Sequence, residues 1–191
     1  MDRLSALIVF AAAAVACSKE PPAEGEPTSR VNGAKVTVKK TDTAAFCDSK
    51  PDREKSPPFA TPPLADGSTL APAKTWRWIN VWATWCKPCV EEMPRLVKWQ
   101  GKLGIDVQFI SVDESDADIA AFAKLHPGIP PTKRLAKPDA QGAWLAQLGL
   151  DAGAPIPVHV FVDPTNHVRC VRAGGVREQD YAAIEALIAG K

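Results

Sequence analysis

The sequence has no excess of charge of either sign. Its 191 residues include 23 lysines and arginines against 22 aspartates and glutamates, a formal net charge of +1. Electrostatic binding to nucleic acid or to an anionic membrane surface needs a basic patch or run, and the chain has none. Neither function is therefore expected. An internal repeat is also missing, and the length predicts one domain with tails.

A hydrophobic run long enough to span a bilayer is missing too. The uncharged run from Leu4 to Ala16 is shorter than the roughly 20 residues that a membrane helix needs. It follows Arg3 and ends in small residues, as the apolar region of a signal peptide does. We therefore predict that residues 1–16 are a signal peptide. An uncleaved anchor is the alternative that the short length disfavours.

Cys17 directly follows the small residues Ala14-Val15-Ala16. This arrangement resembles the signal of a bacterial lipoprotein. The resemblance implies cleavage before Cys17, a lipid on its thiol, and a periplasm-facing protein anchored in a membrane. Ser18 rather than an aspartate comes next, which by the same resemblance favours the outer over the inner membrane. Plain secretion to the periplasm is the alternative.

Cysteines are few, and their number fits export. An exported protein lies in an oxidising compartment, where cysteines can form disulfides. Lipidation of Cys17 would leave Cys47, Cys86, Cys89 and Cys170, an even number that allows three pairings.

The segment after Cys17 is poor in large apolar residues. Residues 17–42 are rich in proline, glutamate, lysine and threonine, which is typical of a flexible tether. A weakly ordered arm packed on the domain is the alternative. We predict that the ordered domain comprises residues 43–191.

The hydrophobic patterns of this domain predict a mixed α/β structure. Strands are expected at 76–82, 105–112, 157–162 and 167–172, and helices at 86–101, 118–125, 140–148 and 178–189. Pro94 predicts a kink in the first helix, and Pro130 begins a loop. The strand–helix–strand order requires a parallel crossover, and the last two strands form an antiparallel hairpin. The sheet is therefore mixed, with helices on both faces.

A cysteine pair, Trp85-Cys86-Lys87-Pro88-Cys89, lies where the first predicted strand runs into the first predicted helix. Residues three apart on a helix are neighbours, so the two thiols can close a disulfide and open it again. The free N–H groups and the dipole at a helix start stabilise a thiolate, which makes Cys86 the attacking sulfur and Cys89 the resolving one. Lys87 adds positive charge, and Pro88 suits the first helical turn.

Half of a zinc site is the alternative interpretation of this pair. Zinc needs two more ligands at suitable spacing. Cys47 and Cys170 are isolated, as are His126, His159 and His167, and none forms a second paired motif. We therefore expect no metal and no cofactor, with His126 and His167 at the surface.

The segment from Val81 to Pro94 resembles the TlpA-type branch of thioredoxin-fold proteins. The tryptophan frame, the two cysteines and the Glu-x-Pro that follows them all match. The resemblance extends from about Pro58 to the C-terminus. It implies an α/β, thioredoxin-like three-layer fold with a mixed central sheet flanked by helices, a strand–helix insertion and an N-terminal extension.

The resemblance also implies an enzyme, an exported thiol–disulfide oxidoreductase that reduces disulfides of periplasmic client proteins. Clients in cytochrome c maturation or oxidase assembly are expected, with a membrane electron donor of the thiol-reducing type. We expect a monomer. A periplasmic copper or zinc metallochaperone using Cys86 and Cys89 is the alternative, although copper-delivering relatives usually space the cysteines by three residues. A non-catalytic adaptor is a third, against which the intact cysteines argue.

A cis-proline opposite the cysteines is a second landmark of the family. The pattern of proline, short strand and aspartate fits Pro157 to Asp163. Ile156–Pro157 is therefore the candidate cis bond, with Pro155 as the alternative. In the family, the backbone before this proline pairs with a bound substrate strand.

Asn80 departs from the family pattern. Many thioredoxins carry a buried aspartate at this position, six residues before the first cysteine. Because an asparagine cannot relay a proton, the proton transfer must involve water or another acid, such as Glu92. The alternative for Glu92 is a solvated acid at the helix start. His159 is expected to be packed and hydrogen-bonded rather than catalytic.

Two cysteines remain outside the motif. Two leftover thiols in an oxidising compartment often pair. We therefore predict a Cys47–Cys170 disulfide that holds the N-terminal segment against the edge of the sheet. Two separate buried thiols are the alternative.

Overall fold

The computed structural model of the protein describes residues 43–52, 54–56 and 58–190. The predicted signal peptide at 1–16, the lipidation site at Cys17 and the tether at 17–42 lie outside the described residues. Within the described part, no helix is both long and apolar enough to cross a bilayer.

The centre of the fold is a five-stranded sheet with the order β3-β2-β1-β4-β5. The strands are β1 (Arg77–Trp82), β2 (Asp106–Ser111), β3 (Thr132–Arg134), β4 (Val158–Val162) and β5 (Val168–Ala173). β1 pairs in parallel with β2 and antiparallel with β4, so the predicted mixed sheet is confirmed. Every residue of β1 and of β4 is buried, as the continuous apolar runs of these two strands predict.

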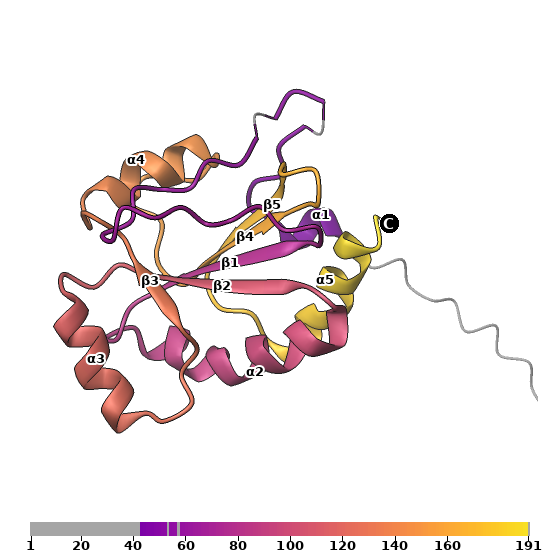
Figure 1. Cartoon of the computed structure of the whole chain (residues 1–191). Helices are drawn as coiled ribbons and strands as arrows, with labels where there is room; N and C mark the ends of the chain where they lie inside the picture. Colours follow the sequence, from indigo (N-terminus) through magenta and orange to yellow (C-terminus); the bar gives the residue numbers. More distant parts are fainter. Residues whose placement is uncertain (1–42, 53, 57, 191) are drawn as a thin grey trace, which may run out of the picture. The chain divides into compact units, whose positions relative to one another are not determined.

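Helices cover both faces of this sheet (Figure 1). They are α1 (Thr43–Phe46), α2 (Lys87–Leu103), α3 (Asp116–Leu125), α4 (Ala140–Gln147), the 3₁₀ turn η1 (Glu178–Asp180) and α5 (Tyr181–Ile188). α2 and α5 lie against one face, and α4 lies on the other. The apolar face of α2 buries Met93, Leu96 and Trp99 in the core.

Two elements differ from their prediction, β3 and the start of the closing helix. β3 lies in a stretch predicted to be a loop, because its three residues are too few for a period-2 pattern. α2 runs without a break from Lys87 to Leu103 and contains Pro94, whose side chain is exposed; the kink expected there stays a prediction. The closing helix begins with a 3₁₀ turn rather than an α-helical one.

The N-terminal segment is fastened to the outer edge of β5. Ser49 forms an antiparallel bridge with Val171, and the amides of Asp48 and Ser49 both donate to the Val171 carbonyl. Cys47 and Cys170 are joined by a disulfide across 123 residues of sequence. The segment therefore acts as a covalently attached cover on the last strand.

The turn between β4 and β5 is organised by a buried carboxylate, Asp163. Burial by itself would raise the pKa of Asp163, but hydrogen bonds from the His167 amide and from Thr165, together with the charge of Arg169, outweigh it and lower the pKa. The Arg169 guanidinium lies 2.5 Å from the Asp163 carboxylate. The turn is completed by Asn166, which adopts a positive φ of 66°.

The Asp163→Asn variant is expected to be less stable at pH 7 by about 1–3 kcal/mol, because it loses charge-assisted hydrogen bonds. A pKa that is lower in the folded state stabilises the fold above the unfolded value of about 3.9, and this stabilisation is lost as the pH falls through the folded pKa. Urea unfolding of wild type and variant at pH 7 and at pH 3 measures this difference in unfolding free energy. The stability gap between wild type and variant should shrink at pH 3. Asp139→Asn, at an exposed position, should show no gap at either pH.

Candidate functional site

The cysteine pair lies at the junction between β1 and α2. Cys86 is the residue before the first helical turn, with extended backbone angles, and Pro88 occupies the first turn. The Val90 amide donates to the Cys86 carbonyl, 3.1 Å away, so Cys86 is the cap residue directly before α2. Cys86 therefore lies among the unpaired N–H groups of the helix start, where the dipole favours a thiolate.

Cys86 and Cys89 form a disulfide, with their Cα atoms 5.3 Å apart. Cys86 keeps 4% of its surface exposed, whereas Cys89 is fully buried. Any attack from outside the protein therefore reaches the Cys86 sulfur first. Lys87 lies 3.7 Å from Glu91, and both side chains are largely exposed, so this ion pair contributes little.

A groove of about 530 Å³ opens beside this disulfide. One wall comes from the cysteine motif and the other from the loop before β4; the lining residues are Trp85, Cys86, Lys87, Pro88, Gln141, Ala154, Pro155 and Ile156. The peptide bond between Ile156 and Pro157 is cis. The fold thus brings two predicted parts of the site together across about 70 residues of sequence.

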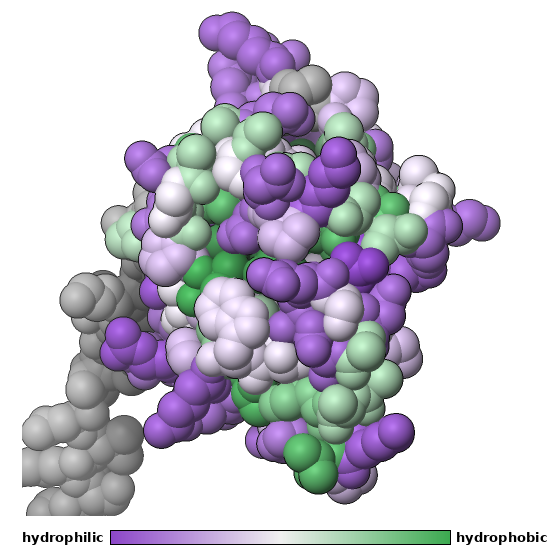
Figure 2. Space-filling model, turned by 90° about the vertical axis from the view of Figure 1, so that its left-hand side faces the viewer, coloured by the Kyte–Doolittle hydropathy of each residue, from purple (hydrophilic) through white to green (hydrophobic). Residues whose placement is uncertain are grey.

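A second groove runs along the other side of Trp85, toward α3. Trp85 is 70% exposed and Leu125 78% exposed, and Phe122 also lines this groove. Figure 2 shows the face that carries α3 and α4, where hydrophobic residues gather at the level of α3. The disulfide is therefore flanked by apolar surface that a partner protein could cover.

The loop that carries Trp85 is held by a carboxylate that the sequence analysis missed. Asp113, which follows β2, is buried and accepts hydrogen bonds from the amide and hydroxyl of Thr84. Ser111 donates to the same carboxylate, with its oxygen 2.6 Å away. The sequence did offer a signal, since Asp113 is an acidic residue just beyond a buried strand. β2 is parallel to β1, so the end of β2 lies beside the end of β1, where the loop with Trp85 begins.

Beneath the disulfide lies a buried polar cluster. Asn80 on β1, Glu92 on α2 and His159 on β4 are each at most 2% exposed. The side-chain amide of Asn80 donates to Glu92 Oε1 at 3.0 Å, and the backbone amide of Val176 donates to Glu92 Oε2 at 2.9 Å. His159 Nε2 lies 3.4 Å from Glu92 Oε1. The interpretation of Glu92 as a solvated acid was wrong, because polar partners from three other segments allow its burial.

The other predicted residues lie elsewhere. His126 is exposed at the end of α3, and His167 is half-buried at the start of β5. Cys47 and Cys170 lie at the β5 edge and form no part of the grooves. In the part of the chain that the structure describes, no three histidine, cysteine or acidic side chains are grouped closely enough to hold a metal ion.

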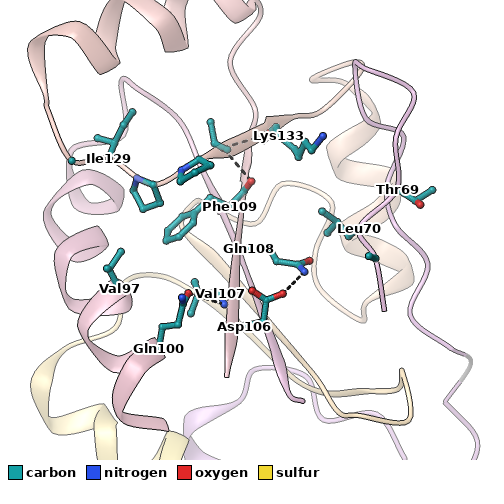
Figure 3. A pocket seen from close by; sticks show the side chains of 15 residues that line it. Thr69, Leu70, Val97, Gln100, Asp106, Val107, Gln108, Phe109, Ile129 and Lys133 are labelled. Atoms are coloured by element: carbon teal, nitrogen blue, oxygen red, sulfur yellow. Dashed lines mark hydrogen bonds between the residues drawn. The ribbon is translucent and has the colours of Figure 1, made fainter. Parts of the chain in front are cut away.

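A further cavity, of about 600 Å³, lies between α2, β2 and the loop before β3 (Figure 3). Phe109 and Val97 line it, and the Gln108 amide donates to Asp106. The residues that line it include no cysteine or histidine. The cysteine pair therefore lies outside this cavity, and Cys86 lines the groove beside the cis-proline loop.

Comparison with protein families gives no match. Over 77 residues the chain is 36% identical to the thioredoxin-like protein YneN of Bacillus subtilis, covering 37% of this chain and 45% of YneN. Over 106 residues it is 27% identical to the thiol-disulfide oxidoreductase ResA of Geobacillus thermodenitrificans, covering 54% of this chain and 57% of ResA. The chain spans about half the length of the curated relatives it matches.

The fold resembles that of solved structures over a larger part of the chain. A thioredoxin-related protein from Neisseria meningitidis serogroup B matches with a TM-score of 0.52 and 26% identity. That match covers 70% of this chain and all of the other.

Proposed function

This chain is a thioredoxin-fold protein with thioredoxin-like thiol-disulfide oxidoreductases as relatives, as the TlpA-type resemblance implied, and we propose that it exchanges disulfides through Cys86 and Cys89. One observation carries the proposal. A cysteine pair that can open and close lies at a helix start, with one sulfur at a groove that the cis-proline loop completes.

Cys86 acts as the nucleophile in the reductive direction. Its thiolate attacks one sulfur of a client disulfide, and the other client sulfur leaves as a thiolate that takes up a proton. Cys89 then attacks the Cys86 sulfur, which closes the Cys86–Cys89 disulfide and releases the client as a dithiol. The protein loses two electrons, and the client disulfide gains them.

Glu92 takes the proton that Cys89 must lose before it attacks. The two residues lie three apart on α2 and are both buried, so they share one face of the helix. The carboxylate also lines a cavity of about 360 Å³ together with Arg95, Gly175 and Arg177, which gives its proton a route to solvent. This is the role that the sequence analysis considered for Glu92 in place of the missing aspartate.

The cellular setting belongs to the same proposal. The signal-like segment before Cys17 supports a lipid-anchored protein that faces the periplasm and is re-reduced by a membrane electron donor. Disulfide-containing clients, such as those of cytochrome c maturation or oxidase assembly, would lie with their disulfide in the Cys86 groove. The apolar surface around Trp85 supports contact with a protein rather than with a small molecule alone.

The test is turnover by the reduced full-length protein. We expect it to reduce insulin and glutathione disulfide and to end with one Cys86–Cys89 disulfide per chain. Cys86→Ser should lower both rates at least about 100-fold, since the nucleophile is lost. Release of the reduced product measures each rate, and thiol counting measures the disulfide formed per chain. Unchanged rates in Cys86→Ser would sink the proposal.

Titration of the reduced protein with copper(I) and zinc distinguishes the metallochaperone alternative. Tight, stoichiometric metal binding by Cys86 and Cys89 without disulfide turnover would favour that function. We expect turnover, and the same Cys86→Ser protein serves as the control for metal held elsewhere.

A further inference from the structure

The indole of Trp78 determines which ring nitrogen of His159 carries the proton. Trp78 Nε1 lies 3.1 Å from His159 Nδ1, and both residues are fully buried. An indole N–H can only donate, so Nδ1 must accept, and the proton of the neutral ring then sits on Nε2. The Asn80 amide nitrogen, 3.4 Å from the same Nδ1, is a second donor there. A proton on Nδ1 would face donors only.

The proton-bearing nitrogen of His159 points toward Glu92. Nε2 lies 3.4 Å from Glu92 Oε1, and it has no hydrogen-bond partner among the described residues. The side-chain amide of Asn80 and the backbone amide of Val176 donate to this carboxylate, and His159 Nε2 is a third nitrogen close to it. Donors to a carboxylate stabilise its charged form, which is the form able to accept a proton.

We propose that Trp78 and His159 are positioning residues for the proton transfer from Cys89 to Glu92. Trp78 fixes the tautomer of His159, and the Nε2–H of His159 faces the Glu92 carboxylate and keeps it aimed at its place beside Cys89. This inference rests on the proposed function, since it assigns the two residues to the second step of that exchange. Neither residue touches the client.

Other charged groups near Glu92 could contribute to the same effect. They are Glu91 and Arg95 on α2, and Arg177 on the segment before α5, all lining the cavity beside Glu92. Arg95 is engaged, because it donates to the Val176 carbonyl at 2.7 Å and lies 3.4 Å from Glu178. These groups are unchanged in the variants below. Differences among the variants therefore report on the His159 imidazole and the indole that positions it.

The experiment separates the two steps of exchange. Reduced full-length protein is mixed with 5,5′-dithiobis(2-nitrobenzoate): attack by Cys86 releases one thionitrobenzoate, and attack by Cys89 releases the second. We expect His159→Leu and Trp78→Phe to slow the second release about tenfold at pH 7 and to move its pH–rate profile toward higher pH. The first release should change little.

Two further variants supply the controls. His159→Gln keeps an amide N–H near the Nε2 position and should restore much of the second rate. Trp99→Phe loses the indole ring that lies 6.2 Å from Trp78, and it should keep the wild-type profile even if stability falls. An unchanged profile in His159→Leu, or an equal shift in Trp99→Phe, would overturn the inference.

Nitrogen NMR of ¹⁵N-histidine-labelled wild-type protein tests the tautomer directly and does not depend on whether a variant folds. We expect a protonated Nε2 and an unprotonated Nδ1 for His159, and a proton on Nδ1 would refute the inference. Failure of the proposed function gives a different result, because the wild-type protein would then not turn over insulin or glutathione disulfide.

Discussion

The Cys89→Ala variant is expected to stop halfway through disulfide exchange and to stay covalently bound to its client. Cys86, at the groove, can still attack, but the buried sulfur that would displace the client is gone. The mixed disulfide should therefore last at least about 100 times longer than in the wild-type protein. Non-reducing gels of cells that express the variant should show adducts, and mass spectrometry of each adduct identifies its partner.

The matched control is Cys86→Ala, which retains Cys89. Because Cys89 is fully buried, this variant should trap nothing. Recovery of the same adducts from Cys86→Ala would contradict the assignment of Cys86 as nucleophile. Addition of dithiothreitol should release every client trapped by Cys89→Ala, which shows that the link is a disulfide.

The double variant Cys47→Ala/Cys170→Ala is expected to lose about 3–5 kcal/mol of unfolding free energy. The bond spans 123 residues of sequence, and the chain-entropy model assigns roughly 5 kcal/mol to a loop of that size. The loss should move the urea midpoint of oxidised protein down by about 2 M. Both cysteines are replaced together so that no free thiol remains to exchange with Cys86.

Removal of the other disulfide is the comparison. Cys86→Ala/Cys89→Ala also lacks two cysteines, but that loop closes over only three residues, so little stability should be lost. Equal losses in the two double variants would contradict a stabilising role specific to Cys47–Cys170. Peptide mapping of oxidised protein checks the pairing itself.

The sequence predicted the parts of the site that depend on neighbouring residues. The motif from Trp85 to Cys89 places a strand end, a helix start and two thiols within one short segment, and the structure has the same order. The choice of Ile156–Pro157 as the cis bond came only from the resemblance, since nothing local distinguishes it from Pro155.

The parts that the sequence missed depend on distant partners. The sequence shows Glu92 as an acid near a helix start, which normally lies in water. Its burial requires donors from the Asn80 side chain and the Val176 amide, the latter 84 residues away, and His159 Nε2 lies 3.4 Å from the same carboxylate. β3 was missed for a related reason, because a three-residue strand exists only through its pairing with β2.

The cover on β5 has a consequence for association between copies of the protein. Unpaired strand edges are templates for pairing with another chain. The β5 edge is occupied by Asp48 and Ser49 and held there by the Cys47–Cys170 bond. The opposite edge, β3, is three residues long and follows Pro130-Pro131, which offer no N–H groups. The protein can therefore present apolar surface around Trp85 to other proteins while offering them little free strand on which to aggregate.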